Sequence, residues 1–400
     1  MEIRELKPKE HLQYIALRNT VFLSNERKDI RAMNENLWEH EAKDNYTRLG
    51  TFDVNGQLQS AVTVIPYTIR MNGNNVKMGG IASVASKPEV RGKGNIRNLM
   101  NAAFNHMNKR GQVFSFLSPF SHPYYRKFGY EICRAVHKVT IPINQLEPYP
   151  FPRHIESYEP GGSITPYEEI YENFIRKRNL AVVRDENAWK KILDRDPYKS
   201  LEFTYLHRCK NGRADAYILY SMEKNDSGKF DVVIKECCWT APSALQGILG
   251  FLAKLGAEAE NVRWSPPCDI NIHALFPECY DLIQHLEPGG MCRLVNVPTA
   301  LKTLRPPAGN GRVTIDIADT FWPVNSGVYT LEWESGNLSV KKSVSASPDM
   351  TTTVETLAQL VTGYLSPDEA HYRDCTTIRS GHIALKDLFP KQPLYLMESF

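Results

Sequence analysis

The chain has 400 residues, of which 42% are hydrophobic and 23% charged, the composition of a soluble globular protein. This length exceeds what a single core usually serves, so two or three domains are expected. Its 48 basic and 45 acidic residues leave a net charge of +3, which does not favour a dedicated nucleic-acid binder.

No stretch of about 18 uninterrupted apolar residues occurs, so no transmembrane helix is expected. The first residues, MEIRELKPKEHLQ, are charged and lack the apolar region of a signal peptide. We therefore expect a cytoplasmic protein with neither a membrane nor a nucleic-acid partner. The eight cysteines form no C-x-x-C pair and are expected to be reduced, and no metal site is predicted. The adjacent Cys237 and Cys238 could be redox-active, but their surroundings read as an ordinary strand.

The first block alternates helical and strand patterns. A helix is predicted over 8–22, followed by a β-meander over 49–86 with Asn-Gly turns at 55–56 and 72–73. A second helix is predicted over 95–110, with one apolar face and Gly111 as its stop, and a buried strand over 113–120.

Proline density rises over 146–166, which indicates a connection between domains. A second α/β block follows, with helices predicted near 166–179, 186–194 and 243–258 and strands over 201–209, 214–222 and 230–239. A third block begins near 289, with strands over 311–319, 327–335 and 337–344 and a helix over 352–365. The predicted domains are therefore 1–150, 151–288 and 289–400.

The stretch SVASKPEVRGKGNIRNLM, residues 83–100, joins a strand to the second predicted helix. A helix start exposes unpaired N–H groups with partial positive charge, and glycines let a ligand approach the backbone. Arg91, Lys93 and Arg97 add formal charge, so the pattern predicts a pyrophosphate cradle. The alternative is a plain turn with solvated basic residues.

Other nucleotide motifs do not fit this stretch. A G-x-G-x-x-G motif would need glycine where Arg97 stands, and the P-loop pattern is absent. The loop follows several antiparallel strands, not the first strand of a βαβ unit, which favours an acyl-coenzyme A over NAD or a nucleoside triphosphate.

The run from Val84 to Gly94, V-x-x-x-P-x-x-R-G-K-G, resembles the acetyl-coenzyme A motif of the GCN5-related N-acetyltransferases (GNAT), R/Q-x-x-G-x-G/A, with Arg91 and Gly94 at matching positions. Ile96 stands where many members have glycine or alanine, and a bulky residue there resembles the enhanced-intracellular-survival (Eis-type) branch. The resemblance implies acetyl-coenzyme A as co-substrate. It implies binding through Val84, Ala85, Ser86, Arg91, Gly92, Lys93, Gly94, Asn95, Ile96 and Arg97, the first three offering N–H groups to the acetyl oxygen.

The segment from Tyr125 to Tyr130, YRKFGY, resembles the family's Y-x-x-x-G-[FY] element. Acetyl transfer to an amine expels a thiolate, which a phenol can protonate as general acid. Tyr125 is the matching position, and Tyr124 and Tyr130 are competitors. Each could instead be an ordinary half-buried core tyrosine.

The chain ends in MESF, and Eis-type enzymes end in a phenylalanine whose carboxylate enters the active site. The resemblance therefore implies that the carboxylate of Phe400 is the base. A terminal carboxylate is ionised at neutral pH, since its ordinary pKa is about 3.5. The alternative is a frayed tail, although PLYLMESF is apolar for one.

The resemblance covers the whole chain. MCRLVNVPTAL, residues 291–301, resembles the element that opens a sterol-carrier-like third domain in this family. The fold class expected is α/β (α+β): two tandem GNAT-like mixed-sheet domains, the second degenerate and without the cofactor loop, followed by a sterol-carrier-protein-like domain. The family also implies a homo-oligomer, often a hexamer.

The resemblance implies a primary amine as acceptor, on an aminoglycoside, a polyamine or a lysine-like side chain of a peptide. Aromatic and acidic groups suit such a cation, and Phe22, Glu26 and Trp38 are candidates, although all three could have ordinary structural roles. Two other functions stay open: a pseudoenzyme that senses acetyl-coenzyme A, and a carrier of lipid or another small ligand in the third domain.

Overall fold

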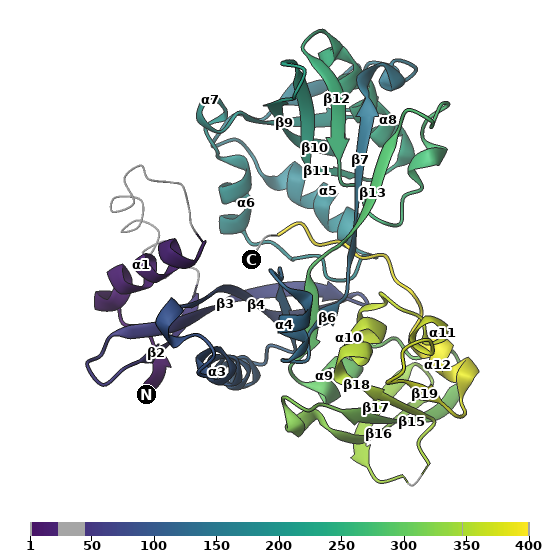
Figure 1. The fold of residues 1–400 in the computed structure, drawn as a ribbon. Coiled ribbons are helices and arrows are strands. Elements are labelled where there is room, and N and C mark those ends of the chain that lie inside the picture. The colour runs from purple at the N-terminus through teal and green to yellow at the C-terminus, as the bar shows by residue number, and fades with distance from the viewer. Residues whose placement is uncertain (1, 23–44, 346, 399–400) are drawn as a thin grey trace. The chain divides into compact units, whose positions relative to one another are not determined.

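The computed structural model describes residues 2–22, 45–345 and 347–398, and Figure 1 shows their elements along the chain. The chain forms two compact units, each built from separate stretches of sequence. Unit 1 contains the chain up to Cys133, Gly290–Lys391 and Glu398, and unit 2 contains Arg134–Gly289 and Gln392–Met397.

Unit 1 holds a seven-stranded mixed sheet in the order β1-β2-β3-β4-β5-β14-β6. These strands are β1 (Glu2–Glu5), β2 (Thr47–Phe52), β3 (Leu58–Met71), β4 (Asn74–Ser86), β5 (Phe114–Leu117), β14 (Met291–Leu294) and β6 (Glu131–Ile132). Strands β1 to β4 form an antiparallel meander, and β4 then pairs with β5 in parallel. The parallel pair needs a crossover, which α3 (Asn95–Lys109) provides.

Helices cover both faces of this sheet: α1 (His11–Phe22) lies on one side and α3 on the other (Figure 1). The predicted helix over 95–110 is confirmed. Its apolar stripe is buried because apolar residues recur at helical spacing, at Leu99, Met100, Ala103, Phe104 and Met107. Gly79 on β4 lets the helix pack closely, since a Cβ there would lie 2.3 Å from the sulfur of Met107.

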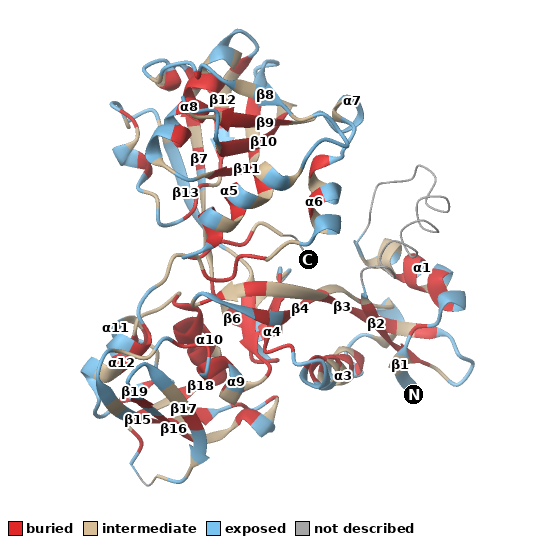
Figure 2. Cartoon of the chain, turned by 180° about the vertical axis from the view of Figure 1, so that it is seen from behind, coloured by how far each residue is buried: buried red, intermediate tan, exposed pale blue. Residues whose placement is uncertain are grey.

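Unit 1 also holds a five-stranded sheet in the order β17-β16-β15-β18-β19. Its strands are β15 (Asn310–Ala318), β16 (Gly327–Glu334), β17 (Asn337–Ser343), β18 (Met350–Thr353) and β19 (Thr377–Ile378). Its helices are α9 (Val297–Leu301), α10 (Val354–Thr362), α11 (Pro367–Ala370) and α12 (His382–Leu388). Helix α10 is buried almost throughout, as Figure 2 shows, because it packs on β14 and β6 of the first sheet as well as on β18.

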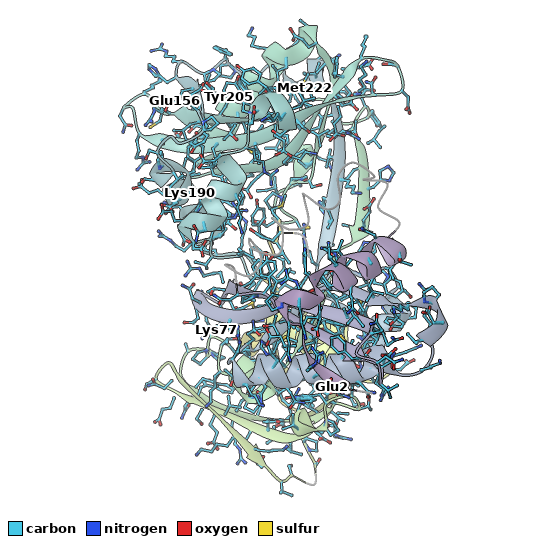
Figure 3. The ribbon with its side chains drawn as sticks, turned by 90° about the vertical axis from the view of Figure 1, so that its left-hand side faces the viewer. Glu2, Lys77, Glu156, Lys190, Tyr205 and Met222 are labelled. Carbon is cyan, nitrogen blue, oxygen red and sulfur yellow. The ribbon has the colours of Figure 1, made fainter. Side chains whose placement is uncertain are left out.

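Unit 2 is built on a second seven-stranded sheet in the order β13-β7-β12-β11-β10-β9-β8. Its strands are β7 (Ala135–Pro142), β8 (Ile155–Ser157), β9 (Glu202–Arg208), β10 (Ala214–Lys224), β11 (Phe230–Trp239), β12 (Ala259–Trp264) and β13 (Ile283–Pro288). Its helices are α5 (Thr165–Ile175), α6 (Glu186–Leu193), the short α7 (Pro197–Ser200) and α8 (Pro242–Ala253). Tyr205 on β9 and Met222 on β10, and Lys190 on α6, are labelled in Figure 3.

Two strands lie in sheets that the sequence did not indicate. The segment opened by Met291 was predicted to begin the third domain, but as β14 it pairs with β5 and β6 and completes the first sheet. Strand β7, which falls inside the predicted domain 1–150, pairs instead with β12 and β13 of the second sheet. The compact units divide the chain after Cys133 and Gly289, and again after Lys391 and Met397.

Candidate active site

The first part of the site is the free end of β4. The parallel pairing of β4 with β5 runs from Met78 to Ile81 and stops where β5 ends at Leu117. Strand β4 continues to Ser86, paired on its other edge with β3. Among the described residues no strand pairs with this last part on the β5 side, so the backbone there offers hydrogen-bonding groups to a ligand. The positive φ of 50° at Ser83 and a register shift nearby mark a bulge in this part of the strand.

The second part is the loop from Arg91 to Gly94, directly before α3. Gly92 and Gly94 have positive φ values of 77° and 79°, and Gly94 is the residue that caps α3. A Cβ added at either glycine would meet no atom within 4 Å, so the backbone faces open space. Arg91 and Lys93 are exposed beside it. A bare backbone, a helix start and two cations together form an arrangement suited to a phosphate group.

The remaining predicted cofactor residues behave differently from one another. Asn95 is buried, and its amide donates to the hydroxyl of Ser60 at 3.3 Å, which in turn lies 2.7 Å from the hydroxyl of Ser86. This chain of polar groups fastens the loop to the ends of β3 and β4. Ala85 is buried, and Val84 and Ile96 pack against the first core. Ala85 and Asn95 can therefore meet a cofactor only through their backbone, whereas the side chains of Val84 and Ile96 are partly exposed.

The third part is the turn that begins at Tyr125 on α4 (His122–Arg126). The Tyr125 ring packs edge-on against Phe120, Tyr124 and Phe128 at 5.4, 5.3 and 6.5 Å between ring centres. Only 3% of the residue is exposed, and its hydroxyl makes no hydrogen bond to any described residue. Burial raises the pKa of Tyr125, and the neighbouring Tyr124 adds to the shift. The phenol is therefore protonated at neutral pH and can donate a proton.

The competing tyrosines differ from Tyr125 in their surroundings. Tyr130 is fully buried, and its hydroxyl lies 2.6 Å from that of Ser115, so it already has a partner. Tyr124 is half-buried, and burial raises its pKa. Sequence reasoning missed Phe120, which is 72% exposed although its ring touches both Tyr124 and Tyr125. A phenylalanine in a loop gave no signal of its own.

Of the four residues predicted to contact the acceptor or to act as the base, the structure describes one. Phe22 is the last residue of α1 and is 55% exposed. Glu26, Trp38 and Phe400 lie outside the described residues.

The tail up to Met397 is ordered within unit 2. The amide of Asn179 donates to the carbonyl of Pro393 at 2.8 Å, and the amide of Tyr395 donates to the carbonyl of Asn179 at 3.0 Å. Tyr395 and Leu396 are buried, and the Tyr395 ring packs on Phe174. The apolar pattern of the tail thus reflects docking for this part of it, not fraying.

The second sheet repeats the β-α-β crossover without the loop. Strand β11 pairs in parallel with β12, and α8 connects them, but α8 starts from Ala241 with a proline at its first position. Neighbouring atoms occupy the space beside its two glycines. A Cβ at Gly250, for example, would lie 2.0 Å from the carbonyl oxygen of Pro150. The absence of a cofactor loop from this domain was predicted.

The other predicted chemistry can be placed briefly. All eight cysteines are free. Cys237 and Cys238 are buried in β11, and burial raises the pKa of both thiols, so they stay protonated. Over residues 2–22, 45–345 and 347–398, no group of three or more His, Cys, Asp or Glu side chains is arranged to hold a metal ion. Within the same ranges, none of the helices has the length and apolar character needed to cross a membrane.

Three family models match the chain: acetyltransferase (GNAT) domains over 2–133 and 180–294, and a sterol carrier protein domain over 297–397. No curated protein matches it. Among solved structures it is similar to a probable N-acyltransferase of unknown function from Enterococcus faecalis, with 22% identity and a TM-score of 0.86, over 100% of this chain and 99% of that one. It is similar to a GCN5-related N-acetyltransferase from Anabaena variabilis, with 18% identity and a TM-score of 0.86, and to Eis1 from Mycobacterium abscessus, with 17% and 0.79, each over the full length of both chains.

The chain is therefore an acetyltransferase of the GNAT family, since its two GNAT domains together cover more than half of it. Two GNAT domains are followed by a sterol-carrier-like domain, and the whole chain has the fold of Eis1. The predicted fold class and family are confirmed.

Proposed function

We propose that this protein transfers the acetyl group of acetyl-coenzyme A to a primary amine by direct attack within a ternary complex. The observation that carries the proposal is the conjunction, in one domain, of the free end of β4, the open glycine loop and the protonated phenol of Tyr125. In the second GNAT domain β11 also continues beyond its parallel pairing with β12, but the helix that follows it begins without an open glycine loop. The acceptor class is an aminoglycoside, a polyamine or a lysine-like side chain of a peptide.

The residues of the loop fit the coenzyme. Arg91, Lys93 and Arg97 would neutralise the pyrophosphate, and the N–H groups at the start of α3, after Gly94, would donate to it. The backbone of Val84, Ala85 and Ser86 would hold the pantetheine arm and donate to the acetyl oxygen. When bound, acetyl-coenzyme A supplies an activated acetyl group on a thioester, whose transfer to nitrogen releases a thiolate.

Two groups of the chain itself are proposed to donate and to accept the protons of the reaction. Tyr125 donates its phenolic proton to the leaving sulfur, which its raised pKa permits because the phenol stays protonated until needed. We propose the carboxylate of Phe400 as the base that holds the ammonium form of the acceptor and takes its proton, directly or through water. Phe22, Glu26 and Trp38 are proposed to contact the acceptor. No covalent acyl-enzyme is required.

The test is thiol release from acetyl-coenzyme A with a panel of amines, for the wild-type chain, Tyr125→Phe, and Tyr124→Phe as the matched control. We expect wild-type turnover, and a fall in kcat of about 10²- to 10⁴-fold for Tyr125→Phe alone. Coenzyme binding without turnover on any amine would favour the sensing pseudoenzyme. Bound lipid together with no affinity for the coenzyme would favour the carrier.

The base is tested separately by removing Phe400 or by adding residues after it. We expect kcat to fall far more than the affinity for acetyl-coenzyme A, because the carboxylate is displaced while the cofactor loop is untouched. Unchanged turnover in the extended chain would remove the carboxylate from the mechanism.

We also propose that the protein acts in the cytoplasm as a homo-oligomer, a hexamer by resemblance, with no nucleic-acid or membrane partner. The near-neutral net charge of +3 supports the exclusion of nucleic acid. Light scattering of the purified chain measures the oligomer directly, and a monomeric mass would contradict this part of the proposal.

A further inference from the structure

The acid turn, defined here as residues 125–132, is held at two points by side chains that come from beyond Gly290 in sequence. We propose that Arg293 and Asp319 at one point, and Gln359 and Arg373 at the other, are positioning residues for Tyr125. The sterol-carrier-like domain then contributes side chains that position the acid of the acetyltransferase site. This inference rests on the function proposed above, with Tyr125 as acid, and all of these residues belong to unit 1.

The first point is a fully buried ion pair. Arg293 on β14 pairs through one guanidinium nitrogen with Asp319, and both side chains have 0% exposure. Its other terminal nitrogen donates to the carbonyl oxygen of Phe128, inside the acid turn. The guanidinium also lies over the Phe104 ring of α3, 4.6 Å from its centre.

Gly129 shows how closely this guanidinium is fitted to the turn. Its φ is +79°, a value that favours glycine. A Cβ on Gly129 would lie 2.0 Å from a terminal nitrogen of Arg293 and 3.2 Å from a methyl carbon of Val354 on α10. The glycine in the Y-x-x-x-G element therefore leaves room for the arginine that holds the turn.

Asp319 is itself held by the loop that follows β15. Its carboxylate accepts from the Trp322 amide at 2.9 Å and from the side-chain amide of Asn325 at 3.0 Å. In the same loop, Phe321 packs edge-on against Phe104 and Phe128 at 5.5 and 5.1 Å.

The loop from Asp319 to Asn325 also reaches the cofactor side of the site. The guanidinium of Arg97, a proposed pyrophosphate ligand, lies 5.2 Å from the centre of the Phe321 ring. One loop of the third domain thus contacts both the cofactor helix and the acid turn.

The second point at which the acid turn is held is its end, at Glu131 and Ile132. Glu131 accepts from Arg126 at 2.8 Å and from Arg373 at 2.9 Å. Gln359 on α10 donates to the carbonyl oxygen of Ile132 at 2.7 Å and accepts from Arg373 at 3.0 Å. Burial acts to raise the pKa of Glu131, but hydrogen bonds from the two guanidinium groups and a backbone amide outweigh it and hold the pKa below its ordinary range.

These contacts matter for chemistry because nothing polar orients the phenol itself. The Tyr125 hydroxyl has no hydrogen-bond partner among the described residues, so its direction is set by ring packing and by the path of the turn. A buried ion pair is also a poor way to gain stability, since apolar residues of similar volume often serve as well. Arg293 and Asp319 are nevertheless both charged and fully buried, and Arg293 donates to the Phe128 carbonyl. We infer that the pair serves to fix the geometry of the acid turn.

The main variants are Arg293→Lys, Asp319→Asn and the apolar pair Arg293→Met with Asp319→Leu. Lysine keeps the charge but cannot bridge Asp319 and the Phe128 carbonyl as the guanidinium fork does. We expect kcat to fall by about 10²-fold, the effect of misplacing a catalytic group by an ångström, while KM for acetyl-coenzyme A stays within about twofold.

The pH–rate profile separates positioning from stability. Activity that needs the phenol is lost as pH rises through its pKa, and burial raises that pKa in the wild type. A loosened turn admits water, so the alkaline limb should move down towards the ordinary tyrosine value of about 10. Asp215→Asn, at the buried His207–Asp215 pair of unit 2, is the matched control and should lower the melting temperature without moving the limb.

Two outcomes would overturn the inference. An apolar double variant that is folded, with wild-type kcat and an unmoved alkaline limb, would show that the pair serves stability alone. If the buried variants do not fold, Gln359→Leu and Arg373→Met test the more accessible point, and wild-type kcat in both would reject the inference.

The wild-type chain and Tyr125→Phe run in the same assay. Loss of the proposed function appears as no turnover by the wild type, or as no effect of Tyr125→Phe. Failure of the present inference appears as normal turnover in the positioning variants of an active enzyme.

Discussion

The two GNAT domains place a helix at the same point of the same crossover, and the residues at the two helix starts explain why only the first is proposed to bind a cofactor. Helix α3 begins after a loop whose glycines face open space, with exposed Arg91 and Lys93 beside them. Helix α8 begins at Ala241 and Pro242, and its glycines serve close packing. The number of glycines therefore does not identify a cofactor loop. The atoms beside each glycine show whether it faces open space or allows close packing.

The largest expected effect comes from Gly250→Val in α8. The new side chain would collide with the backbone carbonyl of Pro150, 2.0 Å from the Cβ position, which cannot swing aside as a side chain could. We expect a loss of about 3 kcal/mol in the free energy of unfolding, the upper range for overpacking, measured by urea denaturation. The folded fraction should bind acetyl-coenzyme A normally, and weakened binding without lost stability would contradict the comparison.

Arg91→Glu probes the first helix start through binding. Replacing a cation by an anion at a pyrophosphate site should weaken acetyl-coenzyme A binding by about 2 kcal/mol, the scale of a charge-assisted hydrogen bond, as measured by calorimetry. Lys109→Glu makes the same charge change at the far end of α3 and should have little effect. Equal losses in both variants would point to general electrostatics and not to a site.

Gly94→Ala should have a smaller effect that divides between stability and binding. There is room for the methyl group, but the φ of 79° is strained for alanine and costs about 1 kcal/mol. We expect a small drop in melting temperature and weaker coenzyme binding, because the methyl group enters the ligand's side of the loop. Lower stability with unaltered affinity would mean that no ligand approaches this backbone.

The smallest expected effect concerns pH and the acid proposed for the first domain. Because burial raises the pKa of Tyr125, kcat should change little between pH 8 and the ordinary tyrosine pKa of about 10. The measurement needs an acceptor whose own pKa lies below about 8, so that the acceptor does not titrate in this range. A steep fall across this range would assign the acid to a more exposed group.

Local chemistry could be predicted from the sequence, and long-range pairing could not. Gly92, Gly94 and the apolar face of α3 lie within a few residues of one another, and their spacing alone predicts a loop and a helix. The segment opened by Met291 reads equally well as a strand in any sheet, because its partners Leu117 and Ile132 lie far away in sequence.

The same limit applies to buried charges. Arg293 and Asp319 look like solvated surface residues until the fold brings them together at 0% exposure. The phenol of Tyr125 could be found from its motif, but its dependence on a later domain could not, since no local pattern links residues 128 and 293.

The place of β14 between β5 and β6 has a consequence for synthesis of the chain. A ribosome delivers the residues up to Ile132 long before Leu294, so the first sheet ends at β5, without β14 to join β6 to it, while the residues in between are made. During that interval the edges of β5 and β6 are unpaired strands of the kind that invite aggregation. A fragment that ends at residue 133 would lack β14 and leave these edges of β5 and β6 unpaired, so we expect it to aggregate.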